Sequence, residues 1–98
     1  MGNTPATLIV GLAYQSIDAA VKAIAFGNIR LACTYLQGVA KLISRQTDIN
    51  LGDIPKRAEG EDQKRYELKL IEWYDNAYAQ IMEAISNYVA NFFDNDDM

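Results

Sequence analysis

Residues 62–93 read DQKRYELKLIEWYDNAYAQIMEAISNYVANFF, and this stretch decides the fold. Its apolar residues recur at intervals of three and four positions, which is the period of an amphipathic α-helix. The central apolar row consists of Leu70, Tyr74, Ala77, Ile81, Ile85, Tyr88 and Phe92. We therefore predict one helix over residues 62–93, which at a rise of 1.5 Å per residue is about 48 Å long.

A first helix is predicted over residues 5–26. Thr4 is a good N-cap and Pro5 suits the first helical position. Apolar residues then recur at helical spacing as far as Ile24, and Gly27 is typical of a helix C-terminus.

A second helix is predicted over residues 29–47, and its apolar row is Ala32, Leu36, Val39 and Ile43. The segment that follows is punctuated by Gly52, Pro55 and Gly60 and is predicted to be a loop. The pattern indicates one all-α domain over residues 1–98, a three-helix up-down arrangement with a long C-terminal helix and an acidic tail at 94–98.

Self-association is expected from the unequal helix lengths. A chain of 98 residues is near the lower end of what builds a hydrophobic core unaided. A hairpin of the first two helices is too short to cover the whole apolar row of the third. The overhang, which contains Tyr88, Phe92 and Phe93, is the predicted contact of a homo-oligomer.

Composition excludes several classes of function. The chain has no histidine, which removes the commonest general base and the usual nucleophile–histidine pairs, so no enzyme, cofactor or metal site is expected. A net charge of −4 disfavours general nucleic-acid binding. The single cysteine, Cys33, fits a reducing compartment, and polar residues interrupt the longest apolar run. We expect a cytoplasmic protein that does not enter a membrane, in the host cytoplasm if the chain is phage-encoded.

The polar side of the second helix is the predicted ligand-binding surface. It carries Arg30, Thr34, Gln37, Lys41 and Arg45, three cations and two hydrogen-bonding side chains with no acid between Ile29 and Thr47. Such a surface suits a ligand that carries phosphates, and either Tyr14 of the first helix or Tyr35 offers a ring on which a base can stack. An ordinary solvated helix face remains the alternative.

The segment Ala32-Cys33-Thr34-Tyr35-Leu36-Gln37, followed by Arg45, resembles a helical motif of small phage anti-defence proteins. These proteins, the anti-CBASS sponge family, sequester cyclic oligonucleotide immune signals. The family pattern is Ala-x-Thr-x-Leu-Gln/Glu with a basic residue eleven positions after the threonine, and the matching segment spans 14 of the 98 residues. The resemblance implies a non-catalytic helical homo-oligomer that binds a cyclic di- or trinucleotide between protomers. It also implies that Thr34 lies at the ligand and that Tyr14 stacks on a base.

Two other functions stay open. A small acidic helical protein can act as an inhibitor or adaptor that covers a basic surface on a protein partner. A long apolar helix can also make the chain a structural subunit of a larger assembly.

Overall fold

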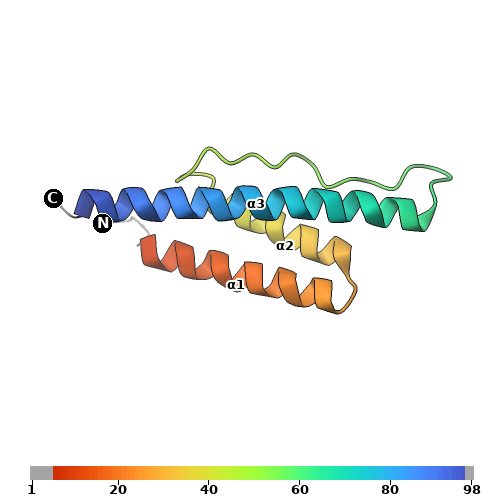
Figure 1. The fold of residues 1–98 in the computed structure, drawn as a ribbon, viewed down its shortest axis with the longest axis horizontal. Coiled ribbons are helices and arrows are strands. Elements are labelled where there is room, and N and C mark those ends of the chain that lie inside the picture. Colours follow the sequence, from red (N-terminus) through yellow and green to blue (C-terminus); the bar gives the residue numbers. More distant parts are fainter. Residues whose placement is uncertain (1–5, 97–98) are drawn as a thin grey trace.

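The computed structural model describes residues 6–96, with side chains described for residues 6–91. Over this range the chain is all-helical, and its elements are α1 (Ala6–Ala25), α2 (Ile29–Leu42) and α3 (Gln63–Asp96) (Figure 1). The predicted fold class, three helices with a long third one, is confirmed. The predicted overhang residues Phe92 and Phe93 and the tail residues beyond them lie outside the described side chains.

The turn between α1 and α2 follows the sequence prediction closely. Gly27 has a φ of 83°, a left-handed conformation that glycine adopts without a Cβ clash. Its N–H donates to the Ile24 carbonyl at 2.9 Å, and the Asn28 N–H donates to the Ala23 carbonyl at 2.8 Å. This pair of bonds is a Schellman motif, which ends α1. The Asn28 side chain then accepts from the Leu31 N–H and caps α2.

α2 is shorter than the predicted helix over residues 29–47, because it ends at Leu42 and continues as irregular turns. Two hydroxyl side chains explain the early end. Ser44 Oγ donates to the Lys41 carbonyl at 2.8 Å, and Thr47 Oγ1 donates to the Ile43 carbonyl at 2.9 Å. Such local bonds compete with the regular helical ladder. Arg45 therefore lies beyond the end of α2.

α3 extends three residues past its predicted end at 93, because residues 61–98 contain neither glycine nor proline to stop it. It is antiparallel to α1 but parallel to α2, so its direction differs from the predicted up-down order, in which α3 would run antiparallel to α2. The contacts show this direction, since Arg30 bonds to Tyr66 and Cys33 to Leu70. The segment between α2 and α3 consequently runs back beside α3 to its N-terminal end (Figure 1).

One main core joins the three helices. α2 lies between the other two, and the largest fully buried side chains are Leu36 and Val39 of α2, Ile81 of α3 and Cys33. The main cluster also contains Ile17 of α1. A smaller cluster of Cys33, Tyr66 and Leu70 anchors the N-terminal half of α3. Burial of these apolar side chains is the dominant stabilising term.

α1 is long and apolar enough to cross a membrane, judged by length and composition alone. The core helix of a soluble protein meets the same test. In this structure α1 buries one side, which carries Ile9, Ala13, Ile17, Ala20 and Ala23, against its neighbours. The predicted cytoplasmic location stays a prediction.

Candidate functional site

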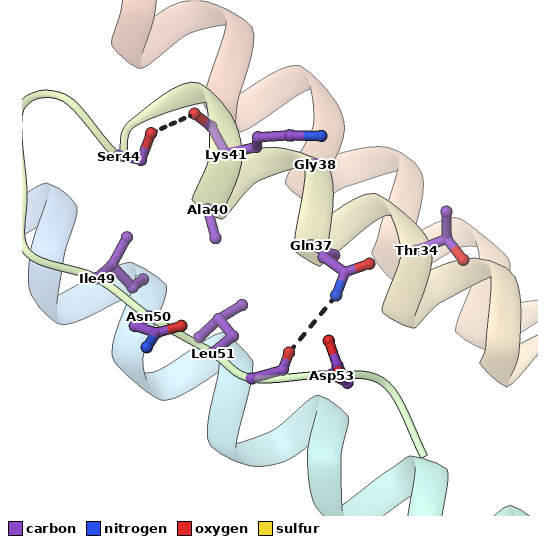
Figure 2. Close-up of a pocket in the computed structure, with 11 residues that line it drawn as sticks. Thr34, Gln37, Gly38, Ala40, Lys41, Ser44, Ile49, Asn50, Leu51 and Asp53 are labelled. Atoms are coloured by element: carbon purple, nitrogen blue, oxygen red, sulfur yellow. Dashed lines mark hydrogen bonds between the residues drawn. The ribbon is translucent and has the colours of Figure 1, made fainter. Parts of the chain in front are cut away.

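A groove of about 640 Å³ separates α2 from the extended segment that follows it (Figure 2). One wall is the polar side of α2, with Thr34, Gln37 and Lys41. The opposite wall contains Asn50 and Asp53. Apolar side chains contribute to the lining at Ala40, Ile49 and Leu51. The groove has the size of a small-molecule site and combines an apolar floor with a few polar groups.

The position of the opposite wall depends on residues along the extended segment. Ile49, Leu51 and Ile54 are partly buried and pack against the core clusters, so the segment follows α3 closely. Gln37 Nε2 donates to the Gly52 carbonyl at 3.5 Å, a long bond that crosses the groove (Figure 2). Gly52 has a φ of 74°, which turns the backbone at this point.

Three of the six predicted ligand residues, Thr34, Gln37 and Lys41, line this groove together. All three side chains are exposed. Thr34 Oγ1 donates to the Arg30 carbonyl at 3.1 Å, a bond within the helix that leaves its oxygen able to accept another hydrogen bond. Lys41 forms no ion pair with any residue of the described range. The groove therefore offers one unpaired ammonium, the hydroxyls of Thr34 and Ser44, two amides and the Asp53 carboxylate.

Arg30 has a different environment from the one predicted. Its Nη1 donates to the Tyr66 hydroxyl at 2.7 Å, and that hydroxyl donates to the Pro55 carbonyl at 3.3 Å. The two bonds connect α2, α3 and the extended segment. Tyr66 carries no charge, so the guanidinium keeps its full positive charge one helical turn before Thr34.

Arg45 and Tyr14 do not line the groove. Arg45 is exposed in the turns after α2, and Tyr14 is exposed on α1. Within one chain neither residue joins Thr34, Gln37 and Lys41 in the lining of the groove. Their predicted roles at a ligand stay predictions.

Cys33 is a packing residue. Its side chain is fully buried, and its Sγ donates weakly to the Leu70 carbonyl at 3.5 Å. Burial raises the pKa of the Cys33 thiol to about 11, although the nearby Arg30 offsets part of the rise. A thiol that stays protonated at neutral pH is a poor nucleophile.

A second hollow, of about 420 Å³, was not predicted. It lies between residues 46–49 and the C-terminal half of α3. Its polar lining includes the carboxylates of Asp48 and Glu83 and the amides of Gln80 and Asn87. No lysine or arginine contributes to it. The sequence could not predict this hollow, because only the return of the extended segment brings Asp48 next to α3.

No group of three or more metal-binding side chains is close enough to hold a metal ion within the described range. Trp73 Nε1 is buried and has no hydrogen-bond partner among the described residues. Its indole packs against both apolar clusters, so it reports on the core that supports the extended segment. Comparison with protein-family models, curated proteins and solved structures finds no match to this chain.

Proposed function

We propose that this chain is a non-catalytic binding protein that sequesters a cyclic oligonucleotide, and that the groove between α2 and the extended segment holds the ligand. The observation that carries the proposal is the meeting of Thr34, Gln37 and Lys41 in one groove of small-molecule size. The resemblance of the segment around Thr34 to a cyclic-oligonucleotide sponge supports the choice of ligand class.

Each of these side chains has a role that its chemistry allows. The ammonium of Lys41 pairs with a phosphate oxygen, and a charge-assisted bond of this kind is about twice as strong as a neutral one. The amides of Gln37 and Asn50 each offer a donor and an acceptor to the edge of a base. Thr34 supplies a hydroxyl at the same wall.

The charge of the groove explains why the proposal includes more than one protomer. The negative charge of Asp53 offsets the positive charge of Lys41 in the lining, so a single groove is close to neutral. A cyclic dinucleotide carries two phosphates, and the remaining cations on this side, Arg30 and Arg45, lie near the two ends of α2. A homo-oligomer brings further cations and the exposed Tyr14 of a neighbouring chain within reach of the ligand.

Native mass spectrometry of the purified protein with cyclic di- and trinucleotides tests this function. The expected result is an oligomer that gains whole ligands of unchanged mass, because no catalytic group acts on them. Isothermal titration calorimetry then measures the affinity of Lys41→Ala, which is expected to fall about ten- to a hundredfold for loss of one charged hydrogen bond. Thr34→Ala is also expected to weaken binding.

The matched control is Lys64→Ala, which removes an exposed lysine of α3 that does not line the groove. This control is expected to bind as the wild-type chain does. Affinity that survives both Lys41→Ala and Thr34→Ala would show that the groove is not the site. Absence of binding to every cyclic nucleotide would contradict the ligand class.

An inhibitor or adaptor that covers a basic protein surface is the second candidate. One observation favours it: no lysine or arginine follows Lys69, whereas Glu72, Asp75 and Glu83 are exposed along α3. One end of the molecule is therefore negative, which steers a basic partner toward it. Recovery of one stoichiometric protein partner, lost in Glu72→Lys/Glu83→Lys, supports this candidate over the first.

A further inference from the structure

The α1–α2 hairpin exposes large apolar side chains in two rows. Leu8, Leu12 and Phe26 of the first row have 51%, 40% and 88% of their surface exposed. Leu31 and Tyr35 of the second row have 41% and 37% exposed. Single exposed apolar residues are ordinary on a protein surface, but a contiguous set of this kind marks an interaction site.

The two rows lie on the same side of the hairpin, away from α3. Cys33 faces α3, where it contacts Leu70. At 3.6 residues per turn, Leu31 and Tyr35 are about half a turn around α2 from Cys33. Leu8 and Leu12 each precede a core residue of α1 by one position. Because both helices are right-handed and antiparallel, this offset places them beside the α2 row.

The spacing within each row is that of a helix–helix seam. Positions separated by alternating steps of four and three residues stay on one side of a helix and pack against a partner helix. On α1 the row consists of Leu8, Leu12, Gln15, Ala19, Lys22 and Phe26. On α2 it consists of Leu31, Tyr35, Gly38 and Leu42. We call these ten positions the hairpin strip.

The chain exposes more surface than a compact monomer of the same mass. The chain exposes 6983 Å², whereas a compact monomer of 11.0 kDa exposes about 5,600 Å². Its radius of gyration of 15.4 Å likewise exceeds the value of about 13 Å for a compact chain of this length. The excess of about 1,400 Å² is spread over the whole elongated chain, which leaves room for a standard interface that buries roughly 800 Å² on each partner.

The charge of the hairpin strip decides which partner fits. Its single ionic residue, Lys22, is paired within the chain to Asp18. The strip therefore has no net field that selects a basic or an acidic partner. Two copies of a neutral apolar surface do not repel each other, which suits a two-fold contact between identical surfaces.

We propose that the hairpin strip binds the hairpin strip of a second copy of this chain, so that two hairpins form the core of a dimer. This surface differs from the α3 overhang predicted from the sequence. It lies on the side of α2 next to the groove, with Gly38 at the border of both. The proposal does not depend on the ligand, because it rests on exposed area and apolar spacing alone.

Sedimentation velocity over a wide range of protein concentrations tests the contact. The wild-type chain is expected to have a multiple of its 11.0 kDa mass and to dissociate on dilution. The double variant Leu12→Lys/Leu31→Lys is expected to sediment as a single chain, because it places four lysines in each dimer interface. Both residues are exposed in the protomer, so circular dichroism is expected to show unchanged helix content.

The matched control is Leu68→Lys, which changes an exposed leucine of α3 outside the hairpin strip and is expected to keep the assembly. Three outcomes overturn the proposal. They are an assembly that persists in the double variant, an assembly lost in Leu68→Lys, and a wild-type chain that stays single at every concentration. A single chain that floats with phosphatidylcholine–phosphatidylglycerol vesicles assigns the strip to a lipid surface instead. Ligand binding in the Lys41→Ala series is read separately, so either proposal can fail without the other.

Discussion

The two exposed sides of α2 have opposite chemistry and opposite surroundings. One side carries Thr34, Gln37 and Lys41 and faces the extended segment across a groove. The other carries Leu31 and Tyr35 and faces no other part of the described chain. The chain thus places its one long loop in front of a polar surface and leaves an apolar surface uncovered.

This difference indicates that the two exposed sides of α2 have different roles. Covering the apolar side with the loop would bury more hydrophobic area, and burial of that kind stabilises a fold. The loop instead packs Ile49, Leu51 and Ile54 along α3 and forms the second wall of the groove. An apolar side left open in this way is available to a partner, whereas the polar side is shaped for a small ligand.

The largest expected effect is a loss of unfolding free energy, and it distinguishes the buried side of α2 from its two exposed sides. Leu36→Ala removes a fully buried side chain from the centre of α2 and is expected to cost about 2–5 kcal/mol of unfolding free energy. The same substitution at Leu31, which is exposed in the protomer, is expected to cost much less. Urea denaturation followed by Trp73 fluorescence measures both values at low protein concentration.

Dimer formation adds a second difference between these two substitutions, which is their dependence on protein concentration. At high concentration Leu31→Ala is expected to lose stability relative to the wild-type chain, because assembly stabilises only the folded state. Leu36→Ala is expected to lose a similar amount at every concentration. Equal losses for Leu31 and Leu36 at low concentration would mean that Leu31 belongs to the core of the protomer.

The second prediction concerns the side of α2 that contacts α3. The pKa of the Cys33 thiol is raised from 9.0 to about 11 by burial, so the unfolded chain ionises first as the pH rises. The contribution of Cys33 is therefore complete below pH 9 and is lost as the pH rises toward 11. Urea titrations between pH 8 and pH 11 are expected to show a steeper fall for the wild-type chain than for Cys33→Ala.

All other side chains are common to both chains, so the difference between the two profiles isolates the thiol. Parallel profiles would show that Cys33 ionises equally in the folded and unfolded states. A reagent that modifies the folded wild-type chain rapidly at pH 8 would also contradict a buried, protonated thiol.

The smallest effect is expected at the polar end of α2. Tyr66→Phe removes the hydroxyl that accepts from Arg30 and donates to the Pro55 carbonyl. The expected loss is about 1 kcal/mol of unfolding free energy, the usual net value of a hydrogen bond. Faster amide exchange of the extended segment is expected to accompany it, because the bonds join that segment to α2 and α3.

Tyr14→Phe is the matched control, since the exposed Tyr14 hydroxyl makes no hydrogen bond to any described residue and lies outside the hairpin strip. This variant is expected to leave both stability and exchange unchanged. If Tyr66→Phe behaves as the control does, the bonded tyrosine does not hold the wall of the groove.

Local signals in the sequence were sufficient for the helices themselves. The turn at Gly27 formed as predicted, and the apolar row from Leu70 to Ile85 packs on the two core clusters. The end of α2 was less predictable. Serine and threonine occur in helices as well as in turns. In this chain Ser44 and Thr47 bond to the backbone where α2 ends.

The candidate site was predicted only in part for the same reason. Helical spacing placed Thr34, Gln37 and Lys41 on one side of α2, and all three line the groove. Arg45 followed the same spacing but lies past the helix end, and Arg30 is bonded to Tyr66, 36 positions away. The opposite wall, with Asn50 and Asp53, was not predicted, because it is set by where the extended segment packs.

The sequence by itself determined the all-α class, the number of helices and the side of each helix that is buried. These properties follow from the 3.6-residue period and from capping residues, which act within a few positions of the chain. Tertiary structure alone decided the parallel course of α2 and α3, the return of the extended segment and the hollows beside it. Those features depend on contacts between distant residues, such as Cys33 with Leu70, whose pairing no local pattern encodes.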